Sequence, residues 1–324
     1  RMSENTAFTE ENIDGFIKKA ERDLGVTYSE EQRTAVRLAS CHRVMVLTGG
    51  PGTGKTTTIR AILALFDMMG LKTALCAPTG RAAKRMGEVC SREAYTIHRL
   101  LGTSLGDEDR LVFEHDENDP IDAEAVIADE CSMIDITLMS SFLKALRPDC
   151  RLIMVGDADQ LPSVGPGNVF SDIIRSGRIE TVKLTEIFRQ ARKSRIVTYA
   201  HMINEGRLPD LRANSGDFFF MRRRDPQKAV ETVISLVSQR LPENMHIPPE
   251  NIQVLSPTRR YDMGTENLNR LLQEALNPSG RGKKEKQFGD FIYREGDKVM
   301  QIKNNYDIMW KTRDGFTSGA GVFN

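Results

Sequence analysis

The amino-acid sequence predicts an α/β fold, in which helices cover both faces of a parallel sheet. Short apolar runs alternate with longer segments whose apolar residues recur at helical spacing, and loops rich in glycine and proline join them. Neighbouring parallel strands need long connections, and a helix between two strands supplies one. Because any doubly wound fold shows this alternation, only the loops that follow the strands can indicate the function.

The elements expected before residue 193 follow from these two patterns. Strands are predicted where apolar runs occur, at 43–47, 72–77, 125–128, 151–155 and 181–184. Helices are predicted where apolar residues follow the helical repeat, at 10–22, 56–69, 80–90, 136–146 and 168–175. Residues 29–32 (SEEQ) resemble a capping box that begins a further helix, although Glu30 and Glu31 stand one and two residues after Ser29 rather than three.

A second and smaller α/β unit is expected from residue 194. Helices are predicted at 194–204, 227–241 and 265–276, and strands at 217–221 and 252–255. These strands are too few for a complete sheet. After Phe288 the pattern changes to short strands separated by glycine turns, which predicts the start of a small β-barrel.

The composition excludes several classes of protein. Lysine and arginine number 45, as do aspartate and glutamate, so this is not a strongly basic protein that coats nucleic acid, although one groove can still be basic. The five cysteines form no CxxC pair, which argues against a disulfide scaffold or a zinc site and indicates the cytoplasm. No run of about 18 apolar residues occurs, so no membrane-spanning helix is expected.

Residues 49–56 read GGPGTGKT, which matches the phosphate-binding pattern GxxxxGK[ST] in full and lies between a predicted strand and a predicted helix. Glycines let backbone N–H groups turn toward phosphate oxygens, Lys55 reaches the β- and γ-phosphates, and the Thr56 hydroxyl coordinates Mg²⁺. A purely structural glycine turn does not explain the whole match. The ATP-binding residues predicted from this loop are Gly50, Pro51, Gly52, Thr53, Gly54, Lys55, Thr56 and Thr57.

Two carboxylates follow the predicted strand at 125–128. In phosphate-loop enzymes, acids at this place hold the metal ion and polarise the attacking water, so we expect Asp129 to bind Mg²⁺ and Glu130 to act on the water. The alternative is an ordinary pair of surface acids. The apolar strand before the pair and the phosphate loop upstream favour the catalytic interpretation.

Two further side chains are candidates for contact with the γ-phosphate. Gln160 follows the predicted strand at 151–155 and precedes a loop stiffened by proline and glycine. A tight connection between elements explains the proline and glycine but not the glutamine. Arg189 lies at the predicted boundary between the two units, where an arginine can stabilise charge that develops during phosphoryl transfer. An arginine after a strand is more often a partner in a surface salt bridge, so only its position favours the catalytic role.

Together these motifs resemble those of the superfamily 1B helicases, and most closely the RecD-like group, the exodeoxyribonuclease V alpha-subunit family of DNA helicases. The resemblance covers about residues 28–324. The segments that carry it are EEQRTAV (30–36), LTGGPGTGKTTT (47–58), APTGRAAKRM (77–86), TIHRLLG (96–102), ADECSMID (128–135), GDADQLPSVGPGNVF (156–170), LTEIFRQ (184–190), SPTRRYDMGTENLN (256–269) and GDKVMQIKNNYD (296–307).

The resemblance implies further roles for residues at matching positions. It implies that Gln32 reads the adenine base and that Lys55, Glu130, Gln160 and Arg189 act in catalysis. Residues in APTGRAA and SPTRR are implied to hold the backbone of single-stranded DNA, and His98 is implied to lie along the DNA path, although a core histidine is an equal alternative for it. The DNA-binding residues implied are Thr79, Arg81, His98, Thr258 and Arg259.

The resemblance also implies the domain organisation. We expect a phosphate-loop NTPase with a helical lead-in (1–29), a first RecA-like motor domain with a parallel sheet (30–193), a partial second RecA-like domain (194–285) and the start of an SH3-like β-barrel insertion (286–324). The two last helicase motifs of the family, one with a Gln-Gly pair and one reading Val-Thr-Arg-Ala, are absent. We therefore expect a truncated chain that hydrolyses ATP weakly and does not unwind DNA by itself.

The implied activity is that of an ATP-dependent DNA helicase of 5′-to-3′ polarity in DNA repair and recombination. ATP and Mg²⁺ are the implied cofactors, and single-stranded DNA is the implied partner, with a nuclease–helicase complex or a single-strand-binding protein as candidate protein partners and no membrane. Two other classes stay open. A small-molecule kinase or ring ATPase would need an acceptor pocket or a neighbour's arginine, and a nucleotide switch would bind ATP without a DNA effect.

Overall fold

The computed structural model of the chain describes residues 10–105, 111–212, 215–300, 305–311 and 318–322. The chain divides into two units, of which the first ends at Phe219 and the second begins at Phe220. Among the described residues, no helix is both long enough and apolar enough to cross a membrane. The division into domains at residues 29, 193 and 285 stays a prediction.

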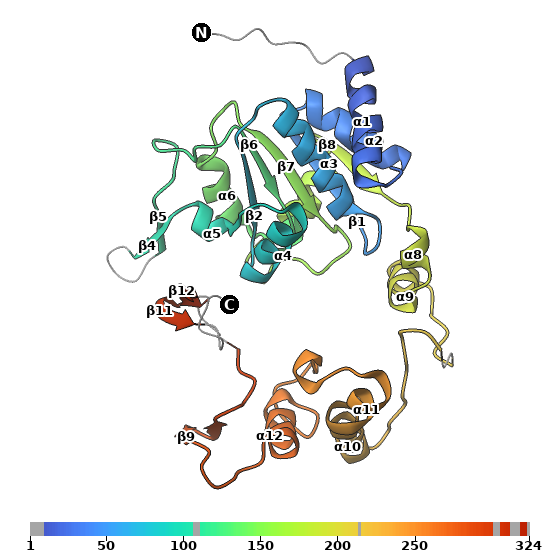
Figure 1. The fold of residues 1–324 in the computed structure, drawn as a ribbon, viewed down its shortest axis with the longest axis vertical. Helices are drawn as coiled ribbons and strands as arrows, with labels where there is room; N and C mark the ends of the chain where they lie inside the picture. Colours follow the sequence, from blue (N-terminus) through green and yellow to red (C-terminus); the bar gives the residue numbers. More distant parts are fainter. Residues whose placement is uncertain (1–9, 106–110, 213–214, 301–304, 312–317, 323–324) are drawn as a thin grey trace. The chain divides into compact units, whose positions relative to one another are not determined.

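The first unit is built on a six-stranded sheet with the order β3-β2-β6-β7-β1-β8, in which all neighbouring strands are parallel (Figure 1). The parallel α/β architecture expected from the sequence is therefore confirmed. The sequence does not predict β3, because its three partly buried residues are too few to show a pattern. The strands are β1 (Val44–Gly49), β2 (Thr73–Ala77), β3 (Ala94–Thr96), β6 (Ala125–Ala128), β7 (Arg151–Gly156) and β8 (Glu180–Leu184).

Helices connect these strands, and most begin or end within two residues of the predicted bounds. Between the short helix α5 (Ile97–Leu100) and β6, the short strands β4 (Thr103–Leu105) and β5 (Leu111–Phe113) pair antiparallel and interrupt the alternation. The helices are α1 (Glu10–Leu24), α2 (Glu30–Cys41), α3 (Lys55–Met68), α4 (Gly80–Cys90), α5 (Ile97–Leu100), the 3-10 helix η2 (Cys131–Met133), α6 (Ile136–Lys144), α7 (Val169–Ser176), α8 (Arg189–Arg192) and α9 (Arg195–Asn204).

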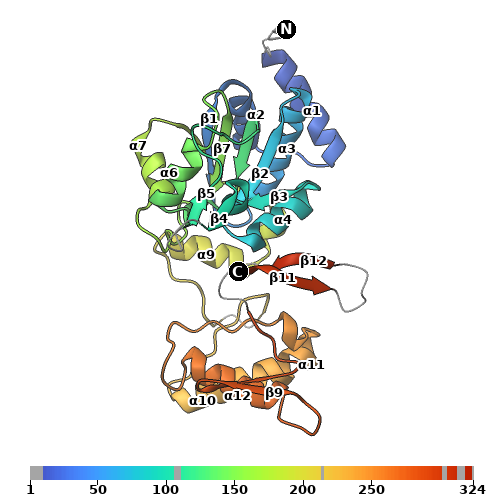
Figure 2. The same ribbon diagram turned by 90° about the vertical axis from the view of Figure 1, so that its left-hand side faces the viewer.

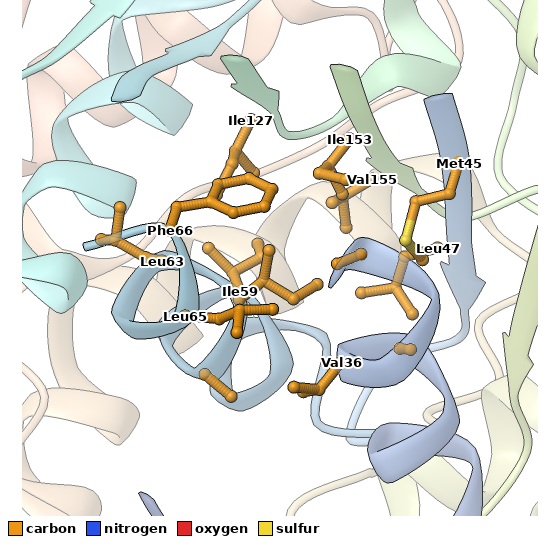
Figure 3. Packing of buried hydrophobic residues seen from close by; sticks show 14 of the residues in the cluster. Val36, Met45, Leu47, Ile59, Leu63, Leu65, Phe66, Ile127, Ile153 and Val155 are labelled. Atoms are coloured by element: carbon orange, nitrogen blue, oxygen red, sulfur yellow. The ribbon is translucent and has the colours of Figure 1, made fainter. Parts of the chain in front are cut away.

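Side chains of β1 alternate between two hydrophobic cores, one on each face of the sheet. Met45 and Leu47 pack with residues of α1, α2 and α3, among them Phe66 (Figure 3). Val46 packs in the second core with Phe142 of α6. Figure 2 shows α1 and α3 on one side of the sheet and α6 and α7 on the other. Because the strand is buried on both faces, its first four residues are all apolar rather than alternating with polar ones.

A capping box begins α2, as the sequence at 29–32 predicts. The Ser29 hydroxyl accepts from the Gln32 N–H at 3.3 Å, and Oε1 of Gln32 accepts from the Ser29 N–H at 3.0 Å. The predicted resemblance to a capping box is therefore confirmed, with Gln32 in the third position in place of a glutamate. The Gln32 side chain is consequently held at the start of the helix.

The second unit consists of helices followed by two short hairpins. The predicted helix at 227–241 is continued by a π-helical turn and a further helix to Met245, and the predicted helix at 265–276 is confirmed as α12. The elements are α10 (Pro226–Ser235), the π-helical turn η3 (Leu236–Arg240), α11 (Leu241–Met245), η4 (Pro249–Asn251), α12 (Thr265–Leu276), β9 (Glu285–Phe288), β10 (Phe291–Arg294), β11 (Asn305–Lys311) and β12 (Ser318–Val322).

The strands predicted at 217–221 and 252–255 are wrong. Neither segment is paired in a sheet of the described residues, and apolar side chains in both are exposed, with Phe219 at 52% and Leu255 at 88% of their full surface. A strand forms only where a neighbour completes its backbone hydrogen bonds. Apolar composition alone could not supply that neighbour.

An ionic network attaches the β9–β10 hairpin to α12. The guanidinium of Arg294 donates to Glu285 at 2.8 Å and to Glu274 of α12 at 3.1 Å, and its side chain is only 7% exposed. Asp297 accepts from Nδ2 of Asn277 at 2.7 Å and from the Arg294 N–H at 2.7 Å. The first hairpin after α12 is therefore fixed to this helix by side-chain hydrogen bonds.

Candidate active site

The phosphate loop connects the carboxyl end of β1 to the first residue of α3. Gly52 and Gly54 have φ angles of +77° and +84°, a left-handed conformation that only glycine adopts without strain. The Thr53 hydroxyl donates to the Gly50 carbonyl at 2.8 Å and stabilises the turn. The backbone N–H groups that precede a helix are thereby grouped at its N-terminus, where anions bind.

A cavity of about 730 Å³ lies over this loop and is lined by all of residues 50–57. Asp129, Glu130 and Gln160 line it as well. Its apolar wall includes Val26 before α2 and Met86 on α4. Most of the predicted nucleotide-binding and catalytic side chains therefore converge on one cavity, which combines a phosphate cradle with an apolar surface suited to a base.

Lys55 is the first residue of α3, and its side chain turns back over the loop. Its ammonium donates to the carbonyl oxygens of Gly49 at 2.6 Å and Gly50 at 3.3 Å. The positive charge is therefore held at the loop itself. Thr56 follows it on the helix and also lines the cavity.

Asp129 and Glu130 are positioned by the end of β6. The N–H of Asp129 donates to the Cys76 carbonyl of β2 at 2.9 Å, and Oδ1 of Asp129 accepts from the Glu130 N–H at 2.9 Å. Burial raises the pKa of both carboxyl groups, and the charge of Asp129 raises that of Glu130 further. Lys55 and Arg85 oppose this increase and favour the ionised forms.

The donor set near the acids suits Mg²⁺. Among the described residues, no group of three or more His, Cys, Asp or Glu side chains could hold a metal ion without other ligands. Asp129 and the Thr56 hydroxyl offer hard oxygen ligands in the same cavity. Mg²⁺ typically binds one or two such protein oxygens together with substrate phosphates and water. The residues present therefore fit a metal ion that arrives with a nucleotide.

Gln160 lies in a turn after β7 that is held by hydrogen bonds within the turn and to β1. The N–H of Gln160 donates to the Asp157 carbonyl at 3.2 Å, and the N–H of Ala158 donates to the Thr48 hydroxyl of β1 at 3.1 Å. Asp157 is buried, and its charge contributes to the raised pKa of Glu130. The turn therefore holds Gln160 at the same sheet edge as the phosphate loop.

Gln32 is almost completely buried at 1% exposure, and both ends of its amide are engaged. Its Oε1 belongs to the capping box of α2, and its Nε2 donates to the Gly54 carbonyl at 3.2 Å. The side chain therefore connects the start of α2 to the phosphate loop. Its role in reading adenine stays a prediction.

The predicted DNA-binding residues in the first unit lie on α4 and α5. Thr79 is the N-cap of α4, where its hydroxyl accepts from the Ala82 N–H at 3.3 Å, and Arg81 is exposed on the first turn. His98 is half-buried on α5 beside Phe113, with ring centroids 5.9 Å apart, and burial lowers its pKa. These placements leave their DNA contacts as predictions.

The structure of this cavity does not test three other predicted side chains. Thr258 and Arg259 belong to the second unit, where the Arg259 guanidinium pairs with Glu266 at 2.7 Å. Arg189 begins α8, but its side chain lies outside the described residues. Its role at the γ-phosphate stays a prediction.

Sequence reasoning missed Arg85 and Phe188, which both line the cavity. A signal for Arg85 was available, because positions 82, 85, 86 and 89 follow helical spacing and share one face of α4. All four positions line the cavity. No comparable local pattern marks Phe188, which reaches the loop through the connection after β8.

The chain is similar in sequence to known proteins. Residues 32–166 match the model of an AAA domain, and residues 268–324 match the model of the ATP-dependent RecD-like DNA helicase SH3 domain. The ATP-dependent RecD2 DNA helicase of Deinococcus radiodurans is 39% identical over 293 residues, which cover 90% of this chain and 37% of that protein. The RecBCD enzyme subunit RecD of Mycobacterium tuberculosis is 36% identical over 251 residues, which cover 68% of this chain and 43% of that protein.

Among solved structures, the Pif1 helicase from Candida albicans is 23% identical with a TM-score of 0.46, covering 65% of this chain and 54% of that chain. The chain spans less than half the length of the two curated relatives above. Two family models match separate parts of the chain, and the second is specific to RecD-like helicases. On these matches and on the motifs that form the cavity, the chain belongs to the RecD-like helicase family.

Proposed function

We propose that this chain binds ATP with Mg²⁺ and hydrolyses it, and that the whole protein couples hydrolysis to movement along single-stranded DNA as a helicase. The observation that carries the proposal is one cavity in which the phosphate loop, Asp129, Glu130 and Gln160 converge. Membership of the RecD-like family supports DNA as the polymer.

Each side chain of the cavity has a role that its position supports. Loop N–H groups and Lys55 bind the phosphates, Glu130 accepts a proton from the attacking water, and Gln160 contacts the γ-phosphate. Thr56 and Asp129 would hold Mg²⁺, which would offset the negative charge that develops on the phosphate oxygens. Arg189 is the proposed second cation, and arginines of this kind contribute roughly 10³–10⁵ in rate.

DNA binding is proposed for Thr79, Arg81, Thr258 and Arg259, with His98 along the path. Hydroxyl and N–H groups at helix starts suit phosphate oxygens, and arginine adds charge and counterion release. Contacts of this kind carry little sequence preference. The 5′-to-3′ polarity is proposed from the family alone.

The proposed setting is DNA repair and recombination in the cytoplasm. A nuclease–helicase complex is one candidate partner, because a relative is the RecD subunit of the RecBCD enzyme. A single-strand-binding protein is the other candidate, since both would act on the same DNA strand.

The test measures binding of a fluorescent ATP analogue, binding of labelled oligo-dT, and ATP hydrolysis with and without oligo-dT. We expect the chain to bind both ligands. Addition of oligo-dT should increase the rate of ATP hydrolysis. Lys55→Ala should lose nucleotide binding and hydrolysis. Lys84→Ala is the matched control, because the side chain of Lys84 on α4 is 81% exposed to solvent. This variant should change neither nucleotide binding nor hydrolysis.

The other classes predict different results. Tight nucleotide binding with neither oligo-dT binding nor an effect of oligo-dT on hydrolysis would contradict the helicase proposal and favour a nucleotide switch. Assembly into rings when ATP is added would favour a ring ATPase. Failure to bind the ATP analogue would contradict the proposed site itself.

A further inference from the structure

The segment after β8, residues 188–201, contacts the phosphate loop through two hydrogen bonds. The backbone N–H of Phe188 donates to the Gly52 carbonyl at 3.3 Å. Nε2 of His201 on α9 lies 3.1 Å from the Pro51 carbonyl oxygen. Because a carbonyl oxygen only accepts, Nε2 must carry the proton in this contact. A histidine 150 positions downstream thus donates to the phosphate loop.

The same segment packs directly against the loop backbone. A Cβ atom added to Gly50 would lie 2.6 Å from Cε1 of His201. A Cβ atom added to Gly52 would lie 2.6 Å from Cβ of Ala191. Both distances are shorter than real side chains tolerate, so the imidazole and the Ala191 methyl occupy space that only glycines leave open. The contact of His201 is therefore one of shape as well as of hydrogen bonding.

Hydrogen bonding of the loop carbonyls matters for phosphate binding. A phosphate loop presents its N–H groups to the anion, and a carbonyl oxygen turned to the same side would repel the anion. Each carbonyl therefore needs a donor elsewhere. The Gly50 carbonyl accepts a hydrogen bond from the Thr53 hydroxyl at 2.8 Å, and the Gly54 carbonyl accepts one from Nε2 of Gln32 at 3.2 Å. For the Pro51 carbonyl, the donor is the imidazole of His201.

We propose that His201 is a positioning residue of the ATP site. Its Nε2–H holds the Pro51 carbonyl away from the bound phosphates, and its ring supports the Gly50 backbone. Together the two contacts keep the loop in the conformation that accepts the triphosphate. This inference rests on the proposed function, because it concerns ATP bound at the same loop.

The helix that carries His201 is anchored near the end of the first unit. The Ser194 hydroxyl and the Arg195 N–H, at the start of α9, donate to the Asp217 carboxylate at 2.5 and 2.7 Å. The ring of Tyr199 on α9 contacts Phe218 edge-on, with centroids 5.1 Å apart. Asp217 therefore positions α9, and through α9 it acts on the imidazole at the phosphate loop.

Two substitutions separate the hydrogen bond from the packing. His201→Phe keeps an aromatic ring beside Gly50 but has no donor for Pro51. His201→Gln loses the ring but places an amide N–H at similar reach. Since one hydrogen bond is removed, we expect His201→Phe to weaken binding of the fluorescent ATP analogue roughly 3- to 10-fold. His201→Gln should recover most of that loss, and Lys84→Ala should show no loss.

Steady-state kinetics distinguish positioning from a general loss of structure. A loop that binds ground state and transition state alike should raise KM for ATP in His201→Phe while kcat changes little. The thermal midpoint of this variant should stay near that of the unaltered chain. Equal ATP affinity and KM in the unaltered chain and in His201→Phe would overturn the proposal. Loss of both affinity and thermal midpoint without recovery in His201→Gln would also overturn it.

Asp217 provides a second test that leaves the loop untouched. Asp217→Ala removes the anchor of α9 and should weaken binding of the ATP analogue in the same direction as His201→Phe. If Asp217 acts through His201, the double variant should lose less than the sum of the two single losses. Additive losses would contradict the connection through α9. If the unaltered chain does not bind the analogue, the proposed function fails instead of this inference.

Discussion

At the scale of single residues, Glu130 has a backbone conformation that few side chains adopt. Its φ angle of +54° lies in the left-handed region, where a residue other than glycine costs about 1–3 kcal/mol. The conformation begins the 3-10 helix at Cys131–Met133 and turns the chain at the end of β6. Strain of this kind persists where the surrounding structure requires it. Here it accompanies the carboxylate that we propose as the general base.

The first prediction concerns the charge beside this base. Burial and Asp129 raise the pKa of Glu130, whereas Lys55 and Arg85 lower it. Because the base must be ionised, hydrolysis should decrease as the pH falls through that raised pKa. Arg85→Gln removes one opposing charge, so the pKa should rise and the acid side of the rate profile should move to higher pH.

The measurement is kcat/KM for ATP against pH without DNA. Arg81→Gln is the matched control, because Arg81 lies one turn earlier on α4 and does not contribute to the pKa of Glu130. A profile of Arg85→Gln that coincides with that of the unaltered chain would show that Arg85 does not affect the base.

At the scale of secondary-structure elements, the start of α2 connects helix capping to the nucleotide site. Ser29 and Gln32 satisfy each other's backbone N–H groups, and Gln32 then donates to Gly54. The capping box thus fixes a side chain that supports the phosphate loop. A local sequence signal therefore has a consequence at a site more than twenty residues away.

The second prediction follows from this cap. Ser29→Ala removes the hydroxyl that accepts from Gln32 and should lower the free energy of unfolding by about 1 kcal/mol. Ser29→Thr keeps a hydroxyl and should cost less. Urea unfolding followed by far-ultraviolet circular dichroism measures both variants. Equal stability of Ser29→Ala and the unaltered chain would mean that the cap contributes nothing.

The third prediction concerns the element that joins α12 to the hairpin after it. Arg294 contacts Glu274 and Glu285 with a side chain that is nearly buried. Arg294→Met should release the β9–β10 hairpin, because the hydrogen bonds to both carboxylates are lost. Limited proteolysis should then cut near residues 289–290 several-fold faster. Arg270→Met, on the same helix, is the control and should leave the cleavage rate unchanged.

At the scale of the whole molecule, the net charge is zero, so DNA binding must depend on local contacts. The 45 basic and 45 acidic residues give no net attraction to a polyanion. Affinity for oligo-dT should therefore come from a few side chains that contact phosphates, such as Arg81. The expected salt dependence is correspondingly modest.

The fourth prediction measures that salt dependence. A plot of log affinity for oligo-dT against log salt has a slope near −0.7 for each phosphate neutralised in single-stranded DNA. Arg81→Ala should reduce the steepness by about 0.7. Lys19→Ala, which changes an exposed lysine of α1 outside the proposed DNA contacts, should leave the slope unchanged. An unchanged slope in Arg81→Ala would remove Arg81 from the DNA contacts.

The sequence predicted five of the six strands of the first unit. Four of them, β1, β2, β6 and β7, contain contiguous apolar runs because they are buried on both faces, whereas the edge strand β8 alternates buried and exposed residues. It missed β3, which is short, and it wrongly predicted strands at 217–221 and 252–255. Strand formation requires a partner from elsewhere in the chain, and no local pattern reports whether that partner is present. The same limit applies to the site, where Arg85 was detectable from helical spacing but Phe188 was not.

By itself, the sequence determined the motifs on which the proposed chemistry rests. The phosphate loop, the acids after β6 and the RecD-like motifs are contiguous, and their residue types follow directly from what phosphates, Mg²⁺ and water require. Only the tertiary structure decided which distant residues support that chemistry. Gln32 contacts Gly54, and His201 contacts Pro51, because folding brings the ends of parallel strands and the helix after β8 to the same edge of the sheet.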